Sequence, residues 1–142
     1  QLEEVHLNDR VVACKIFMEN LCQHRDIDLQ LDLCEENPLV SMDTSLFEQV
    51  IINIIKNATE SIDTHGKVII RTSSVPLMLE IGDTGRGISK EVESKLFSPF
   101  FSTKPNGQGI GLIFIREVLM KHGCTFSLRT YPYGITRFRI YF

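Results

Sequence analysis

The stretch LMLEIGDTGRG, residues 77–87, joins an apolar strand pattern to a turn that carries one carboxylate and two glycines. A carboxylate at the end of a strand can accept a ligand's N–H, and glycines let a flat ring approach the bare backbone closely. Asp83, Gly85 and Gly87 are therefore candidate ligand-binding residues. The same pattern is also a common acidic β-turn, so the surrounding elements must decide between the two interpretations.

The residues on both sides of this turn alternate between helical and extended patterns. Helices are expected over 9–23, 44–62 and 110–121, and strands over 27–33, 67–73, 77–81, 125–130 and 135–141. In the first helix, Asn8 or Asp9 is the expected cap, and Val12, Ile16, Phe17 and Leu21 are the expected apolar face. This order predicts an α+β sandwich, with about three helices packed on one face of a mixed, mainly antiparallel sheet of about five strands.

Length and composition restrict the class of protein. The 142 residues are expected to form a single domain, 1–142. The net charge is −3, from 15 Lys and Arg against 18 Asp and Glu, which disfavours a nucleic-acid partner. No apolar run is long enough to span a bilayer. The four cysteines form no CxxC pair, which indicates reduced core residues and a cytoplasmic location.

Asn53 and Asn57 are unusual in the middle helix. They are four residues apart, so they share one face, beside the stripe of Ile and Val residues that should face the core. Asparagine is a poor residue for a helix interior because its side chain competes for backbone hydrogen bonds. The pair suggests a ligand or a metal at this edge, although two polar residues on a solvated flank would give the same pattern.

Gly107, Gly109 and Gly111 lead directly into the third helix. Free backbone N–H groups and the positive end of the helix dipole would form an anion site suited to phosphates. The segment is neither a P-loop nor a dinucleotide fingerprint, since the residues that define those motifs are missing. By itself it could also be a flexible loop.

Taken in order, these motifs resemble a known family. The Asn helix, the Asp-Gly-Gly turn, the aromatic segment Phe97–Phe101 and the Gly-rich helix start resemble the catalytic ATP-binding domain of sensor histidine kinases. That family belongs to the superfamily shared with gyrase, mismatch-repair ATPases and the large heat-shock chaperone, and its fold is the Bergerat-type ATP-binding fold. The resemblance covers residues 7–142.

The resemblance implies roles for residues around the nucleotide base. Asp83 would accept a hydrogen bond from the adenine amino group. Gly85 and Gly87 would let the backbone pass close to the base. Thr136, in the last predicted strand, matches the threonine that supports the adenine contact in the family.

Other residues are implied to bind the phosphates and Mg²⁺. Asn57 would coordinate a Mg²⁺ ion that bridges the phosphates, with Asn53 on a phosphate or a metal-bound water. Lys104 would reach the γ-phosphate or remain a solvated lid residue. The phosphates would lie in the second glycine motif, which consists of Gly107, Gly109, Gly111 and Leu112. A lid running from about 95 to 108 would cover them.

The resemblance also implies an activity and partners. The domain would bind Mg²⁺–ATP and, as a protein-histidine kinase, donate the γ-phosphate to a histidine on a separate dimerisation and phosphoacceptor domain of the same kinase, in cis or in trans within a homodimer. A response regulator would be an indirect partner, and the parent protein could be anchored in a membrane. None of the four histidines has the family's phosphoacceptor setting, so residues 1–8 are expected to be a linker from that domain.

Three alternatives remain. An ATP-hydrolysing switch of the gyrase or chaperone type is disfavoured, because those relatives place a glutamate base where this chain has Asn53, and an amide cannot take the proton. A superfamily serine kinase acting on a regulatory protein would share the nucleotide site. A nucleotide-binding module without catalysis is disfavoured by the intact Asn57, Asp83, Gly109 and Gly111.

Overall fold

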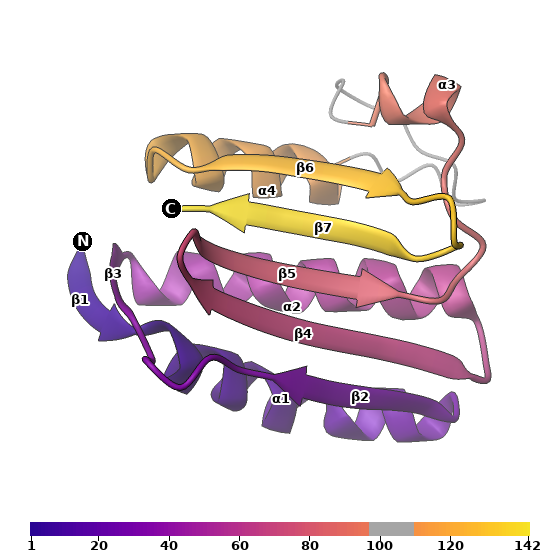
Figure 1. Ribbon diagram of the computed structural model, residues 1–142, viewed down its shortest axis with the longest axis horizontal. Coiled ribbons are helices and arrows are strands. Elements are labelled where there is room, and N and C mark those ends of the chain that lie inside the picture. Colours follow the sequence, from indigo (N-terminus) through magenta and orange to yellow (C-terminus); the bar gives the residue numbers. More distant parts are fainter. Residues whose placement is uncertain (97–109) are drawn as a thin grey trace.

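The computed structural model describes residues 1–96 and 110–142. Its main sheet has five strands in the order β2-β4-β5-β7-β6 (Figure 1). β2 pairs with β4 in parallel, and each other neighbouring pair is antiparallel. The predicted mixed, mainly antiparallel five-stranded sheet is therefore confirmed. The strands are β2 (Ile27–Asp32), β4 (Gly66–Ser74), β5 (Leu77–Asp83), β6 (Thr125–Thr130) and β7 (Thr136–Tyr141).

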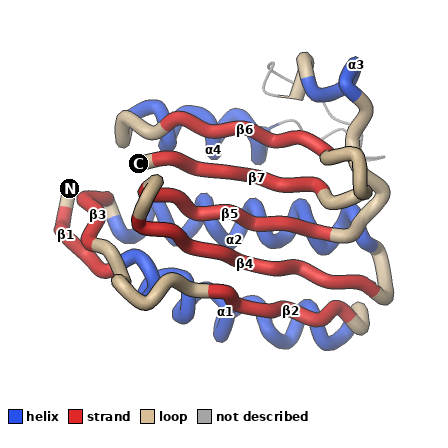
Figure 2. The backbone as a smooth tube through the Cα atoms, in the orientation of Figure 1, coloured by secondary structure: helices blue, strands red, loops and turns tan. Residues whose placement is uncertain are grey.

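Three helices cover one face of this sheet, as predicted. In Figure 2 they lie together behind the strands, and α2 contacts both neighbouring helices as well as β4 and β5. The fourth helix is the short α3, which packs beside the end of β6. The helices are α1 (Leu7–His24), α2 (Thr44–Ile62), α3 (Lys90–Glu93) and α4 (Ile110–Lys121). None of the helices in the described part of the chain is both long and apolar enough to cross a membrane.

The core lies between the sheet and the helices. Alternate strand residues such as Val68, Ile70, Leu79 and Ile81 are buried there, because successive side chains of a strand point to opposite faces. α2 supplies the predicted stripe of buried side chains, and Asp43 caps its first turn by accepting a hydrogen bond from the Leu46 N–H at 3.2 Å. The buried residues of α2 are Phe47, Val50, Ile51, Ile54, Ile55, Ala58 and Thr59.

The predicted apolar face of the first helix is wrong. Val12, Ile16 and Phe17 are 40%, 70% and 70% exposed, whereas Leu21 is half-buried. The side that faces the core uses cysteine and methionine in place of branched residues, and these behave as small or adaptable hydrophobes. The buried apolar residues of α1 are Leu7, Val11, Cys14, Met18 and Cys22.

The predicted cap of α1 is also wrong. The helix begins at Leu7 after His6, whose side chain makes no capping hydrogen bond. Asn8 is buried inside the fold: its amide donates to the Cys34 carbonyl at 2.8 Å, and its side-chain oxygen accepts from the Thr72 hydroxyl at 2.7 Å. This side chain therefore connects α1 to β4 and does not cap the helix.

Residues 1–8, expected to belong to a linker, include an ordered strand. β1 (Glu3–His6) pairs antiparallel with β3 (Leu39–Met42), and the two form a separate two-stranded sheet at the N-terminal end of α1 (Figure 1). A connection to a phosphoacceptor domain remains a prediction.

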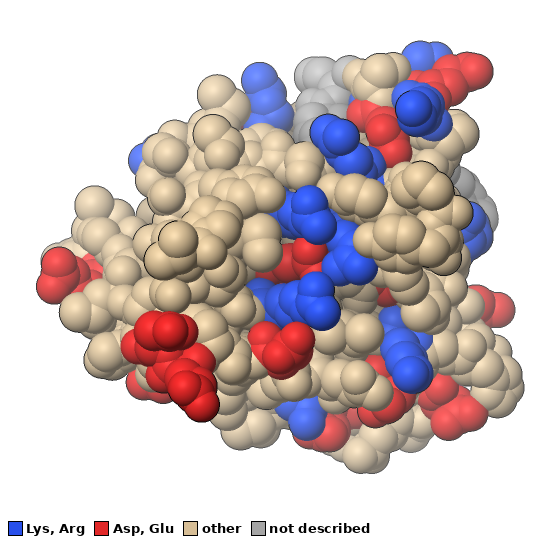
Figure 3. Space-filling model, in the orientation of Figure 1, with Lys and Arg blue, Asp and Glu red and all other residues tan. Residues whose placement is uncertain are grey.

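The sheet face that carries no helices has a charged cluster at its centre. Glu80 is only 2% exposed and accepts from Arg137 Nη1 at 2.5 Å and Arg139 Nε at 2.8 Å, and Arg71 Nη1 lies 3.8 Å away. Arg139 also donates to the Tyr131 hydroxyl at 2.8 Å. Figure 3 shows basic side chains gathered over the middle of this face around acidic ones. One buried carboxylate of β5 thus holds arginine side chains from the two strands that flank it, β4 and β7.

We predict that Glu80→Gln lowers the free energy of unfolding by about 1–3 kcal/mol, because arginines placed around a carboxylate would lose their counter-ion. Denaturant unfolding of the variant and the parent domain measures this change. The control is Glu35→Gln at an exposed turn, which should shift the free energy of unfolding by less than about 0.5 kcal/mol. Equal effects of the two substitutions would contradict the structural role of Glu80.

Candidate functional site

The candidate site lies where β5 ends. Asp83 is the last residue of β5, and it pairs in register with Thr136 of β7, which in turn pairs with Thr130 of β6. Directly opposed residues of neighbouring strands point to the same face, so the three side chains form a row on the face that the helices cover. Asp83 and Thr136 are 6% and 5% exposed. The site is therefore a line of polar groups at the edge of an apolar core.

The turn after Asp83 is held against the C-terminal end of α2. The Gly85 N–H donates to Asp83 Oδ1 at 2.8 Å, and the Arg86 N–H donates to the Ser61 carbonyl at 3.2 Å. A Cβ atom on Gly85 would lie 2.7 Å from the carbonyl carbon of Ser61. Any side chain at residue 85 would therefore push the turn away from α2. This close approach within the fold is a reason for glycine that is separate from the predicted contact with a base.

Gly87 has a different constraint. Its φ is +78°, a conformation that side chains rarely adopt, and a Cβ atom would lie 3.1 Å from the Thr130 hydroxyl oxygen. Glycine at 87 thus lets the chain leave the turn and pass close to β6.

Ser61 also shows which face of α2 meets the turn. Asn53, Asn57 and Ser61 are spaced four residues apart, so they lie along one side of the helix. Because Ser61 contacts Gly85 and Arg86, this side faces the Asp83 turn. Both asparagines are half-buried. The structure thus aligns the two motifs, 26 residues apart at Asn57 and Asp83, on the same side of the domain.

Asp83 is the acidic group of this row, and its burial changes its pKa. Burial raises the pKa of Asp83 to about 6, whereas the Gly85 N–H and the charge of Arg86 act to lower it. The carboxyl is therefore ionised at neutral pH at a cost in stability. A buried carboxylate with few internal donors can accept a hydrogen bond from a ligand.

The second glycine motif is described only in part. Gly111 is the second residue of α4, which begins at Ile110 as predicted, and Leu112 is half-buried against the core. Lys104, Gly107, Gly109 and the aromatic segment 97–101 lie outside the described residues. Their predicted roles remain predictions.

Sequence reasoning missed Thr130. Its hydroxyl oxygen accepts from the Ile88 N–H at 2.7 Å and lies 2.7 Å from the Thr136 hydroxyl, and its backbone N–H donates to Glu93 at 3.1 Å. A threonine at the end of a strand is not distinctive in sequence. Only the register of β6 against β7 places it beside Thr136.

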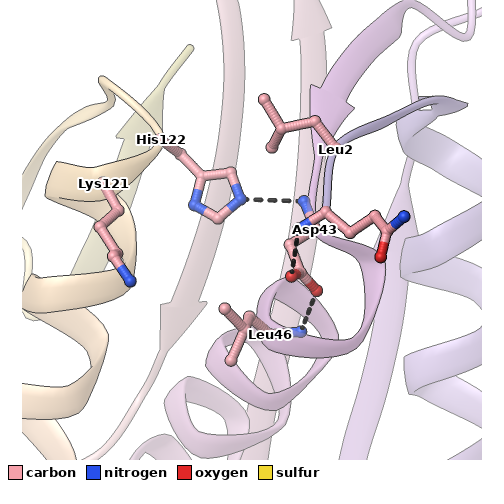
Figure 4. A pocket seen from close by; sticks show the side chains of 6 residues that line it. Leu2, Asp43, Leu46, Lys121 and His122 are labelled. Carbon is pink, nitrogen blue, oxygen red and sulfur yellow. Dashed lines mark hydrogen bonds and ion pairs between the residues drawn. The ribbon is translucent and has the colours of Figure 1, made fainter.

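A pocket of about 250 Å³ lies at the other end of α2 (Figure 4). His122 Nε2 accepts from the Asp43 backbone N–H at 2.9 Å, and its Nδ1 lies 2.8 Å from the Val118 carbonyl. Both ring nitrogens of His122 are thus used within the fold. Within residues 1–96 and 110–142, no group of three His, Cys, Asp or Glu residues could hold a metal. This pocket therefore contributes to the connection between α4 and α2.

Comparison with known proteins agrees with this arrangement. Residues 42–142 match the model of the family described as "Histidine kinase-, DNA gyrase B-, and HSP90-like ATPase". The chain belongs to this family. The expected α+β sandwich of the Bergerat type is thereby confirmed.

Two curated relatives are named histidine kinases. The signal transduction histidine-protein kinase AtoS of Escherichia coli is 31% identical over 140 residues, which cover 96% of this chain and 23% of the relative. The sensory histidine kinase/phosphatase NtrB of Rhodobacter capsulatus is 32% identical over 113 residues, which cover 69% of this chain and 32% of the relative. The chain thus spans about a quarter to a third of the length of these relatives.

Solved structures share the fold over nearly the whole chain. A nucleotide-free form of the catalytic domain of histidine kinase ThkA superposes with a TM-score of 0.88 at 28% identity, covering 99% of this chain and 97% of that domain. The mycobacterial sensor histidine kinase MprB superposes with a TM-score of 0.83 at 24% identity, covering 99% of this chain and 95% of that one, and it supports the fold alone.

We predict that Asp83→Asn becomes more stable relative to the parent domain as the pH rises. The folded pKa of about 6 exceeds the ordinary aspartate pKa of 3.8, so the folded state holds the proton between about pH 4 and pH 6. The parent's stability therefore falls as the pH rises through this window, whereas the neutral amide does not titrate. Between pH 4.5 and pH 7.5, urea unfolding should show the free energy of unfolding of the variant rise relative to that of the parent by up to about 2 kcal/mol.

The control for this measurement is Asp28→Asn, at an exposed position of β2. The difference in the free energy of unfolding between this variant and the parent should change little between the two pH values. A pH-independent difference for Asp83→Asn would show that the carboxyl titrates normally in the folded domain.

Proposed function

We propose that this domain binds Mg²⁺–ATP at the Asp83 row and donates the γ-phosphate to a histidine on a separate dimerisation and phosphoacceptor domain. The observation that carries the proposal is Asp83 itself, a buried carboxylate whose turn rests on the α2 face that bears Asn53 and Asn57. Membership of the histidine kinase-like ATPase family and the names of the relatives support it.

The base would bind against Asp83. A carboxylate accepts from the amino group of adenine but meets the carbonyl oxygen of guanine with lone pair against lone pair, so the site would select ATP. Thr136, opposite Asp83 in the ladder, would support this contact with its hydroxyl.

The side chains of α2 fit a metal ion that arrives with the nucleotide. Mg²⁺ prefers oxygen ligands, keeps several waters and commonly takes one or two protein ligands besides the substrate's phosphates. The amide oxygen of Asn57 is suited to be the protein ligand, with Asn53 one turn away to contact a phosphate or a metal-bound water. When bound, the ion would neutralise phosphate charge during transfer.

The phosphates would extend toward the start of α4. Gly111 and Leu112 lie in its first turn, where the backbone N–H groups and the positive end of the helix dipole would favour anions. Gly107, Gly109 and Lys104 would complete this part of the site and are assigned from the sequence alone.

Phosphoryl transfer is favoured over hydrolysis by the chemistry of Asn53. An amide cannot remove a proton from water, so the site would position ATP without activating water as a nucleophile. The nucleophile would then be an imidazole of a second domain. A response regulator would receive the phosphate from that histidine. In support, the structurally similar histidine kinase ThkA forms a complex with the response regulator protein TrrA.

We predict that Asn57→Ala removes most of the Mg²⁺-dependent part of nucleotide affinity. Calorimetry should show ATP binding weakened about tenfold or more, or about 1.4 kcal/mol, when Mg²⁺ is present, and almost no change in EDTA. Asn20→Ala, at an exposed position of α1, is the matched control. Identical Mg²⁺ dependence in the variant and the parent would contradict the assignment of Asn57.

We also predict that the domain labels an added phosphoacceptor domain on histidine and labels none of its own four histidines. Transfer should be slow because separating the domains replaces a tethered encounter with a bimolecular one. Incubation with γ-labelled ATP, with and without the phosphoacceptor domain of the parent kinase, measures this transfer of label. The Asn57→Ala variant should not transfer label to the added domain.

The outcomes separate the alternatives. Acid-labile label on the added domain supports the histidine kinase. Rapid release of free phosphate without that domain favours an ATPase switch, and label on a serine of a regulatory protein favours a serine kinase. Tight ATP binding without transfer to any protein indicates a module without catalysis.

A further inference from the structure

Thr130 joins three segments of the candidate site, and neither the family motifs nor the proposed roles above use it. Its oxygen accepts from the Ile88 N–H at 2.7 Å, just beyond the Asp83–Gly87 turn. The same oxygen lies 2.7 Å from the Thr136 hydroxyl. Its backbone N–H donates to the Glu93 carboxylate of α3 at 3.1 Å. This one residue therefore fixes the end of the turn, the start of β7 and the last residue of α3 relative to one another.

Either hydroxyl could donate in the bond between Thr130 and Thr136, and the two directions leave different hydrogens for a ligand. The Ile88 N–H can only donate, so the Thr130 oxygen accepts at that contact. A single hydrogen lies between the two hydroxyls. If Thr136 supplied it, the Thr130 oxygen would accept twice and the hydrogen of Thr130 would be left over. If Thr130 supplies it, the hydrogen of Thr136 is the one left for a ligand. With a ligand acceptor bound there, each hydroxyl would accept once and donate once, and each bond would polarise the next.

We propose that Thr130 is a positioning residue of the nucleotide site, which directs the Thr136 hydroxyl as a donor toward the space beside Asp83 and anchors the turn through Ile88. This inference rests on the proposed function, since Thr136 needs a nucleotide to receive its hydrogen bond. The donor would then lie beside the acceptor carboxylate of Asp83. Adenine presents the complementary pair, an amino donor next to a ring-nitrogen acceptor.

The position of Gly87 supports this role. A Cβ atom there would lie 3.1 Å from the Thr130 hydroxyl oxygen and 3.2 Å from its Cγ2, so backbone and side chain already approach closely. The turn and Thr130 therefore constrain each other. A substitution that keeps the volume of Thr130 and removes its hydroxyl tests the hydrogen bonds without opening a cavity.

The test uses Thr130→Val, Thr130→Ser, Thr136→Val and the double valine variant, with ADP and Mg²⁺ as the probe in calorimetry. Thr130→Val should weaken ADP binding about 3- to 10-fold, the effect expected of one or two lost hydrogen bonds. Thr130→Ser should bind within about twofold of the parent because it keeps the hydroxyl. The matched control is Thr125→Val, at an exposed position of the same strand.

A double-mutant cycle tests the coupling between the hydroxyls. With Thr136→Val in place there is no hydroxyl to direct, so adding Thr130→Val should weaken ADP binding less than it does in the parent. Hydrogen exchange provides a readout that needs no nucleotide. The Ile88 amide should exchange faster in Thr130→Val, and should stay as protected as in the parent in Thr130→Ser and Thr125→Val.

Three results would overturn the inference: parent-like ADP affinity in Thr130→Val, equal weakening by serine and valine, or additive effects in the cycle. If the parent domain itself binds no ADP, the proposed function fails and the ligand-directing role fails with it. In that case Ile88 exchange still reports whether Thr130 anchors the turn, so the two failures are distinguishable.

Discussion

The packing of Gly85 against Ser61 fixes the geometry on which the rest of the candidate site depends. Because no side chain fits between them, the backbone of the turn lies directly on the last turn of α2. This contact orients α2 so that the face with Asn53 and Asn57 points to Asp83. The residues proposed to bind a base and a metal-bound phosphate thus lie on one side of the domain, although they come from separate elements.

The carboxylate of Asp83, in the same region, is proposed to bind a ligand but lowers the stability of the fold. Burial raises the pKa of Asp83 to about 6, so the ionised form that can accept from adenine is also the form that destabilises the fold near neutral pH. Elsewhere the domain uses buried polar groups differently. Glu80 is surrounded by arginines, and Asn8 makes hydrogen bonds to the Cys34 carbonyl and the Thr72 hydroxyl. Among the described residues Asp83 has no such cluster of arginines, and local departures of this kind are expected at functional sites.

The elements with strong periodicity were predictable from sequence, and contacts that depend on register were not. Alternation in β2 and the apolar stripe of α2 were predicted correctly, because burial on one face imposes those patterns. The prediction for α1 failed because its core side uses Cys14, Met18 and Cys22, while Ile16 and Phe17 are exposed. The sequence motifs pointed to Asn57 and Asp83 as candidate residues, whereas Ser61 and Thr130 became apparent only from the packing of α2 and the pairing of β6 with β7.

Base selection by Asp83 is the central claim, and competition between ADP and GDP in the presence of Mg²⁺ tests it most directly. The parent domain should bind ADP at least about tenfold more tightly than GDP, and Asp83→Asn should weaken ADP binding and narrow the difference, since an amide can both donate and accept. GDP binding as tight as ADP binding in the parent domain would show that Asp83 does not read the base, and would contradict the account.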